Sequence, residues 1–302
     1  MLEIKKTAQL QGHQGSVFGL VQGRDAQHIL SSGGDGWVVE WNLDKPDLGK
    51  LMAKVDTQVF SLATIPDSLR AVVGDMNGGV HWLDFSDVNA TRDIAQHLKG
   101  TFSIRYFEEL LWTAGGDGTL TQWNPDTMRT LNSIQLSTHS LRVLATCASR
   151  SEIAVGTSDR YIYIVDSQTL DIKTRIENAH QNSVFALCYS SDNRYLISGG
   201  RDAQLRVWNI ENNYECISEQ SAHWFTINDI AYHPTQPVFA TASRDKTIRI
   251  WDGVTFELIK ALDTIRDGGH INSVNRLLWT PDGQQLISCS DDRSLIVWSC
   301  SF

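Results

Sequence analysis

"LISGGRDAQLRVWN", residues 196–209, is the stretch that decides the fold. An apolar run ends at two glycines and an Arg-Asp pair, and an alternating run then leads to Trp208. Alternation with a period of two is typical of β-strands, and the polar break between the runs is typical of a tight turn. We therefore predict a β-hairpin.

The same layout recurs along the chain, with an Asp six residues before a Trp and four residues after a Ser or Thr. The other clear copies are "ILSSGGDGWVVEWN" (29–42), "LWTAGGDGTLTQWN" (111–124), "FATASRDKTIRIWD" (239–252) and "LISCSDDRSLIVWS" (286–299). Weaker copies are aligned by their turns, so that Asn77-Gly78 places Leu83 rather than Trp82 at the Trp position. Seven repeats result, with equivalent residues Trp41, Leu83, Trp123, Val165, Trp208, Trp251 and Trp298.

Each repeat holds about four short strands, and such a small sheet must stack on its neighbours to bury both faces. The repeats resemble WD repeats, and the chain resembles a seven-bladed WD40 β-propeller over nearly its whole length. The resemblance implies an all-β fold of seven four-stranded antiparallel blades in a single domain, residues 1–302. Only "SCSF" follows Trp298, so we expect the N-terminal strand within "EIKKTAQLQGH" (3–13) to complete the last blade and close the ring.

Five repeats also contain a histidine ahead of the Ser or Thr. One Ser, His and Asp would suggest a hydrolase, but an active site is made once and this set occurs five times. In WD repeats these residues form a hydrogen-bonded tetrad with the Trp, so the resemblance implies a structural role. The sets are His13/Ser31/Asp35/Trp41, His97/Thr113/Asp117/Trp123, His180/Ser198/Asp202/Trp208, His223/Thr241/Asp245/Trp251 and His270/Ser288/Asp292/Trp298. Repeats two and four depart from the pattern, with Val55/Val73/Asn77/Leu83 and Ser137/Val155/Asp159/Val165.

The composition, 41% hydrophobic and 20% charged residues, is that of an ordinary soluble globular protein. A net charge of −9 disfavours binding to nucleic acid or to an anionic membrane. The N-terminus lacks the apolar core of a secretory signal, and the five cysteines form no C-x-x-C pair, so we expect a cytoplasmic protein. The histidines lack the close spacing of metal ligands and no nucleotide-binding signature is present, so we expect no metal and no cofactor.

If the repeated residues build the scaffold, function is to be sought at exposed positions that vary between repeats. The resemblance implies partner binding on the face that carries the turns before each first strand. We take as candidates the residues five places after each His position, two arginines that precede turn aspartates, and the aromatic residue after His223. These are Phe18, Phe60, Phe102, Arg142, Phe185, Asn228, Asn275, Arg201, Arg244 and Trp224. Packing between blades is the alternative role of the phenylalanines and of Trp224.

The sequence thus predicts a non-catalytic scaffold, monomeric or part of a larger complex, that binds a protein or peptide. The expected ligand has an apolar anchor for the phenylalanines and acidic groups for the arginines. The family's Trp-Asp-x-Arg motif for docking to a ubiquitin-ligase adaptor is absent from "WNLD", "WNPD", "WNIE" and "WDGV". The alternative is a propeller enzyme with a hydrolytic or metal-assisted site in the central channel, which needs carboxylates or histidines at the channel mouth.

Overall fold

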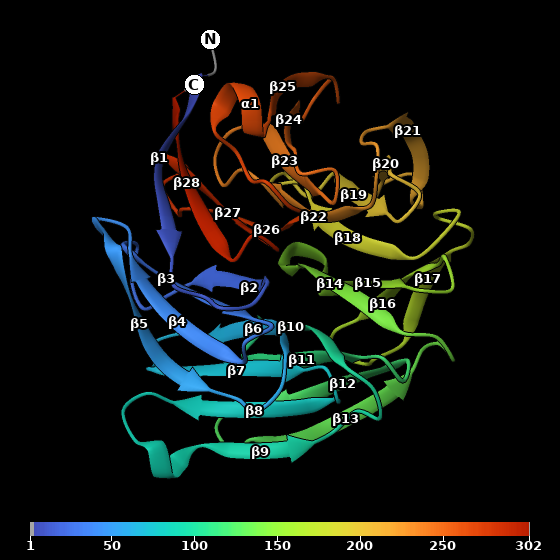
Figure 1. Ribbon diagram of the computed structural model, residues 1–302. Helices are drawn as coiled ribbons and strands as arrows, with labels where there is room; N and C mark the ends of the chain where they lie inside the picture. The colour runs from blue at the N-terminus through green and yellow to red at the C-terminus, as the bar shows by residue number, and fades with distance from the viewer. Residues whose placement is uncertain (1–2, 302) are drawn as a thin grey trace.

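The computed structural model describes residues 3–301 and shows seven four-stranded antiparallel sheets arranged around a central axis (Figure 1). We number these sheets as blades 1 to 7 along the chain. The innermost strands of successive blades contact one another, and the innermost strand of blade 7 contacts that of blade 1, so the ring is closed. The predicted fold class is confirmed.

Short strands account for most of the described chain. Blades 1 to 3 consist of β2 (Val17–Gln22), β3 (His28–Gly33), β4 (Trp37–Asn42), β5 (Lys45–Lys54); β6 (Val59–Ile65), β7 (Arg70–Asp75), β8 (Gly79–Asp84), β9 (Arg92–Ala95); and β10 (Thr101–Phe107), β11 (Leu110–Gly115), β12 (Thr119–Asn124), β13 (Arg129–Gln135). Blades 4 and 5 consist of β14 (Leu141–Cys147), β15 (Glu152–Thr157), β16 (Ile162–Asp166), β17 (Ile172–Ile176); and β18 (Val184–Tyr189), β19 (Tyr195–Gly200), β20 (Gln204–Asn209), β21 (Glu215–Ser221).

The last two blades complete the ring. Blades 6 and 7 consist of β22 (Ile227–Tyr232), β23 (Val238–Ser243), β24 (Ile248–Asp252), β25 (Leu258–Leu262); and β26 (Val274–Trp279), β27 (Gln285–Ser290), β28 (Ser294–Ser301), β1 (Glu3–Gln11). Within residues 3–301, helical structure is limited to α1 (Thr264–Asp267) and two single 3₁₀ turns, Val88–Ala90 and Ala148–Arg150. No helix within residues 3–301 is long and apolar enough to cross a membrane.

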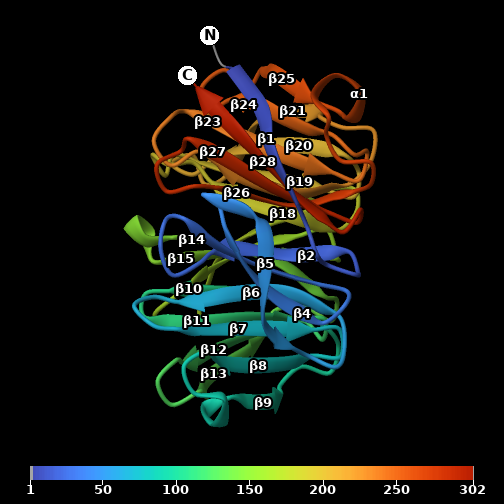
Figure 2. The same ribbon diagram turned by 60° about the vertical axis from the view of Figure 1, so that its left-hand side comes forward.

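The N-terminal strand closes the ring, as predicted. β1 pairs antiparallel with β28 as the outer strand of blade 7, and Figure 2 shows the two strands side by side. Leu10 of β1 lies opposite Leu295, and both are fully buried in an apolar cluster that also contains Trp41 of blade 1. The closing strand therefore contributes to the apolar packing between blades 7 and 1 as well as to the sheet.

The repeated polar residues form the predicted tetrad in five blades. In blade 5, Trp208 Nε1 donates to Ser198 Oγ at 2.9 Å, and His180 Nε2 lies 2.8 Å from the same oxygen. His180 Nδ1 lies 2.9 Å from the Asp202 carboxylate. The same three contacts, at 2.7–3.2 Å, recur in blades 1, 3, 6 and 7. Each network satisfies polar groups whose burial would otherwise be costly, which is a structural role.

Burial and charge fix the protonation states within a tetrad. Burial alone would raise the pKa of Asp202, but hydrogen bonds from His180 and from backbone N–H groups lower that pKa to about 2. Burial lowers the pKa of His180 because it disfavours the charged imidazole, although Asp202 opposes this effect. A neutral imidazole thus bridges the hydroxyl and the ionised carboxylate.

Blades 2 and 4 hold together by other contacts. Val55, Val73 and Leu83 pack in one apolar cluster between blades 1 and 2, so the polar network of blade 2 is replaced by apolar packing. In blade 4 the hydroxyls of Ser137 and Thr157 both donate to Asp159. Replacing a whole polar network by apolar groups of similar shape can be nearly neutral in free energy.

Candidate functional site

A β-bulge occurs near the start of the innermost strand in every blade. The pairing between the first two strands of blade 1 shifts register between Val17 and Gly19, which leaves Phe18 as an extra residue. The equivalent shifts in the other blades leave Phe60, Phe102, Arg142, Phe185, Asn228 and Asn275 as the extra residues. Bulges redirect side chains and are common beside functional sites. The seven bulged residues are the same seven that the sequence places five residues after each His position.

These seven side chains meet at one end of the central channel. Together with Arg276 they line a single cavity of about 240 Å³, which we call the channel mouth. The aromatic side forms a continuous row, with ring centres 5.4 Å apart for Phe18 and Phe60 and 5.6 Å apart for Phe60 and Phe102. All four phenylalanines are partly exposed. Phe18, Phe60 and Phe102 therefore contact one another across blades, and all four phenylalanines present apolar surface to the cavity.

Arg142 completes the aromatic row. Its guanidinium carbon lies 4.3 Å from the centre of the Phe102 ring and 5.4 Å from that of Phe185, a cation-π arrangement. Arg142 Nε donates to Ser158 Oγ at 2.8 Å, and within residues 3–301 no carboxylate forms an ion pair with it. Burial, and to a smaller extent the charge of Arg201, lowers the pKa of Arg142. The mouth thus contains an arginine whose charge is not neutralised by an acidic neighbour.

The polar side of the mouth is held by hydrogen bonds between blades. The Asn228 amide donates to Ser273 Oγ and to the Val274 carbonyl at 2.9 and 2.8 Å, and the Asn275 amide donates to the Val17 carbonyl at 2.9 Å. The two asparagines therefore connect blade 6 to blade 7 and blade 7 to blade 1. Their amide N–H groups already have partners, so these residues define the shape of the mouth.

Two further arginines, one at the mouth and one deeper in the channel, were missed by the sequence analysis. Arg276 follows the bulge of blade 7, and its Nη1 lies 3.6 Å from the Asp229 carboxylate. Arg105 lines the next cavity of the channel together with Arg276 and Asp229. Burial lowers the pKa of Arg105 and raises that of Asp229. A charged residue at a channel-lining position that is apolar or small in most repeats was the available sequence signal.

Three predicted residues lie outside the channel mouth. Arg201 and Arg244 are exposed on the turns of blades 5 and 6, where their backbone N–H groups bond to Ser183 and Thr226. Trp224 is 83% exposed, and its backbone N–H donates to the Asp245 carboxylate at 3.1 Å. They share the face of the tetrad loops with the mouth but do not line its cavity.

The channel is poor in groups for acid–base chemistry. Among the side chains that line its three cavities within residues 3–301, Asp229 is the only carboxylate. It already accepts a hydrogen bond from the Leu277 backbone at 2.9 Å. The part of the chain that the structure describes holds no group of three or more His, Cys, Asp or Glu residues arranged to hold a metal ion.

Comparison with known protein families agrees with the propeller fold of the structure. The family model described as "WD domain, G-beta repeat" matches residues 4–42, 172–209, 214–252 and 260–299, just over half of the chain. The chain is a WD40-repeat protein. The longest unmatched stretch of this WD40 protein, residues 43–171, covers blades 2 and 3 and the first three strands of blade 4.

The curated relatives of this chain include WD-repeat proteins, and the relatives named here are longer than the chain. The WD repeat-containing protein WDS homolog of Arabidopsis thaliana is 27% identical over 270 residues, covering 83% of this chain and 49% of the relative. Transducin beta-like protein 3 of Bos taurus is 24% identical over 328 residues, covering 97% of this chain and 40% of the relative. Protein FIZZY-RELATED 1 of Arabidopsis thaliana is 29% identical over 186 residues, covering 60% of this chain and 37% of the relative. The chain thus spans half or less of the length of these relatives, and WD40 propellers in general serve as protein-interaction scaffolds.

Proposed function

We propose that this WD40 protein is a non-catalytic scaffold whose channel mouth binds a peptide segment of a partner protein. An apolar side chain of the partner packs on the phenylalanine row, and an acidic side chain faces Arg142 and Arg276. The observation that carries the proposal is that seven bulged residues, one from each blade, line a single cavity and combine four aromatic rings with an unneutralised arginine. Apolar surface bordered by charge is typical of recognition sites.

The charge balance of the channel supports an acidic ligand group. Arg142, Arg276 and Arg105 lie in or below the mouth, whereas Asp229 is the one carboxylate among the described channel-lining side chains. An incoming carboxylate would meet positive charge beside the half-buried Arg142, where electrostatic interactions are stronger than in bulk solvent. This local excess contrasts with the overall charge of −9, so it is a property of the site.

The rival function, a hydrolytic or metal-assisted enzyme, has less support in this channel. Such chemistry needs at least two convergent acid–base or metal-binding groups. Asp229 is paired with Arg276 and with a backbone N–H, and the neighbouring lining residues in the described chain are mainly apolar side chains and arginines. We also propose a cytoplasmic location, which is supported by five free cysteines in the described chain, two of them buried.

The test is recovery of native partners with a mouth variant. The double variant Phe18→Ala/Phe185→Ala is compared with the wild-type protein by affinity purification from the native host and quantitative mass spectrometry, after circular dichroism has confirmed folding. Phe225→Ala is the matched control because Phe225 is 59% exposed and lies outside the mouth. We expect the mouth variant to lose partners that the control retains. Equal recovery by both variants would exclude the mouth as the binding site.

A further inference from the structure

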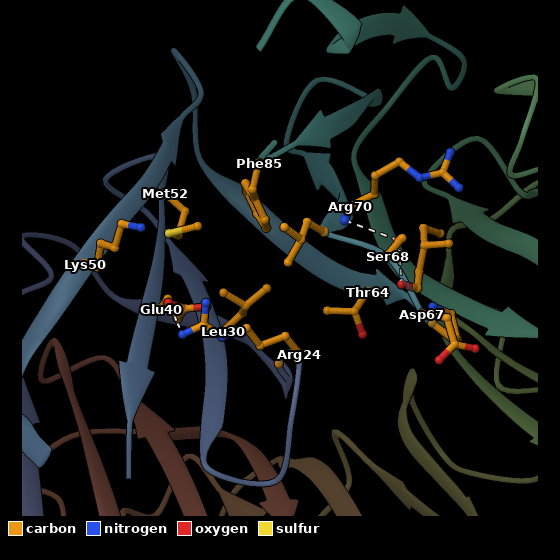
Figure 3. Close-up of a pocket in the computed structure, with 14 residues that line it drawn as sticks. Arg24, Leu30, Glu40, Lys50, Met52, Thr64, Asp67, Ser68, Arg70 and Phe85 are labelled. Carbon is orange, nitrogen blue, oxygen red and sulfur yellow. Dashed lines mark hydrogen bonds and ion pairs between the residues drawn. The ribbon is translucent and has the colours of Figure 1, made fainter. Parts of the chain in front are cut away.

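A second cavity lies between blades 1 and 2, at the strand ends opposite the channel mouth. Its volume is about 450 Å³, within the range of about 300–1,000 Å³ typical of ligand sites. The turns that follow β2 and β6 form its rim, and β4 and β5 form its far wall (Figure 3). We call this cavity the blade 1–2 cleft.

Blade 1 differs from the other blades at one position that lines the cleft. The residue before the tetrad Trp position is Glu40 in blade 1, whereas the others are Trp82, Gln122, Ile164, Val207, Ile250 and Val297, all buried. Glu40 forms an ion pair with Arg24 at 3.7 Å on the blade 1 side of the cleft (Figure 3). A carboxylate cannot pack against the next blade as an apolar side chain does, because its desolvation is costly. Glu40 therefore lines the cleft on the blade 1 side and does not supply apolar packing there.

The middle of the cleft is apolar. Figure 3 shows Leu30, Met52 and Phe85 around its centre, and Leu69 lies on the rim with 47% of its surface exposed. An apolar side chain placed here would remove this surface from water, which favours binding. The cleft thus offers a place for one or two bulky apolar side chains.

Opposite charges flank the apolar centre. Lys50 lies on β5 of blade 1 and Asp67 lies on the turn of blade 2, on opposite sides of Met52 and Phe85 in Figure 3. Within residues 3–301 neither Lys50 nor Asp67 takes part in an ion pair. The remaining charges of the cleft are matched, because Arg24 pairs with Glu40 and Arg70 pairs with Asp126. The unmatched charges are therefore positive at one end and negative at the other.

We propose that the blade 1–2 cleft binds a peptide segment of a partner protein with an acidic residue, one or two bulky apolar residues and a basic residue in sequence. The acidic residue faces Lys50, the apolar residues fill the space beside Met52 and Phe85, and the basic residue faces Asp67. This site is independent of the channel mouth, because the two cavities share no lining residue. A scaffold with both sites holds two partner segments on opposite faces of the ring.

The test is selection of a random nine-residue peptide library displayed on phage against the wild-type protein. Selected peptides are synthesised with a fluorescent label and titrated by anisotropy against the wild-type protein and single variants. We expect peptides in which a bulky apolar residue separates an acidic from a basic residue. Lys50→Glu and Asp67→Lys should each weaken binding by about fivefold, because each reversal turns a surface attraction into a repulsion. Leu69→Ser should weaken binding to a similar extent by removing apolar contact.

Selecting peptides with the charge variants as the immobilised targets tests the role of each charge more directly. Lys50→Glu leaves negative charge at both ends, so its selected peptides should carry two basic residues, and those selected with Asp67→Lys should carry two acidic residues. The matched controls are Lys54→Glu, Asp56→Lys and Leu131→Ser, which are exposed changes outside the cleft. They should leave both affinity and selected sequences unchanged.

Three results would overturn the proposal. The first is that no peptide binds. The second is that all bound peptides are insensitive to Lys50→Glu, Asp67→Lys and Leu69→Ser, including the case in which only Phe18→Ala/Phe185→Ala weakens them, which would leave the channel-mouth proposal intact. The third is self-association in analytical ultracentrifugation that Leu69→Ser abolishes, because a second copy of this chain would then occupy the cleft.

Discussion

Arg142 lies with its guanidinium over the ring of Phe102, 4.3 Å from the ring centre, at the mouth of the propeller channel. Both residues are the bulged residues of their blades, so the same backbone irregularity directs a cation and an aromatic ring to one point. Stacking holds the arginine in place, and none of the ion pairs in the described chain involves its charge. This relationship is the basis for the proposal of an acidic and apolar ligand.

Loss of one tetrad hydroxyl should destabilise a blade. Ser198→Ala leaves the buried Trp208 Nε1 and His180 Nε2 without their common partner, and we expect the free energy of unfolding to fall by about 1–3 kcal/mol. Urea unfolding followed by tryptophan fluorescence measures the change. Ser218→Ala, on the outer strand of the same blade, is the control and should change stability by less than about 0.5 kcal/mol.

Ring closure should depend on apolar contact as well as on strand pairing. Leu10→Ala removes a fully buried side chain from the cluster between blades 7 and 1, and we expect a loss of about 2–5 kcal/mol. Leu131→Ala, in which the replaced side chain is 49% exposed, is the matched control. Thermal unfolding measures both. An equal, small effect of the two changes would contradict the role of β1 in closure.

Stability should fall in acid in two steps. Burial holds the pKa values of His97, His180 and His223 below 6.5, so the unfolded chain binds more protons and the free energy of unfolding decreases as pH falls below about 6.5. Asp202 and Asp292, with pKa values lowered from 3.8 to about 2, add a second loss between about pH 4 and pH 2. Urea unfolding at a series of pH values measures the profile. Constant or increasing stability between pH 7 and pH 5 would contradict the buried, neutral imidazoles.

Replacing one turn residue by glycine should stabilise the protein. Lys246 has a φ of 75° at the position where blades 1, 2 and 3 have Gly36, Gly78 and Gly118. A residue with a Cβ atom is strained by about 1 kcal/mol in this region, so Lys246→Gly should raise the free energy of unfolding by up to about 1 kcal/mol. Lys54→Gly, within a strand, should lower it. Thermal unfolding distinguishes the two directions, and a lower midpoint for Lys246→Gly would be inconsistent with strain at this turn.

The sequence alone was sufficient for the architecture because each repeat places its turn and Trp position at fixed spacing. The choice of Leu83 over Trp82 is an example, since Leu83 pairs with Ala71 in blade 2 as Trp41 pairs with Ile29 in blade 1. Alternation in the fifth repeat predicts strands at 183–189, 195–200, 203–209 and 214–220, and the four observed strands of blade 5 agree with these limits to within one residue. Period-two alternation determines these features locally.

The details of the sites depend on contacts between blades, which local patterns do not specify. The sequence identified Asn228 and Asn275 as contact positions, but not that their amides bond to neighbouring blades. A one-residue bulge has no sequence signature, so the convergence of seven side chains rested on the family resemblance. The blade 1–2 cleft was overlooked, although Glu40, a charge at a position that is mostly apolar in the other repeats, was visible in the alignment.

The most direct test of the channel-mouth proposal is the affinity of a recovered partner for Arg142→Glu, measured by isothermal titration calorimetry. We expect the dissociation constant to rise at least about tenfold, because the reversal places a carboxylate where an acidic ligand group should bind. Arg129→Glu, an exposed arginine on outer strand β13, makes the same change of net charge away from the channel and should leave the dissociation constant within about twofold of wild type. Equal affinities of the two variants would contradict the proposal that the channel mouth binds the partner.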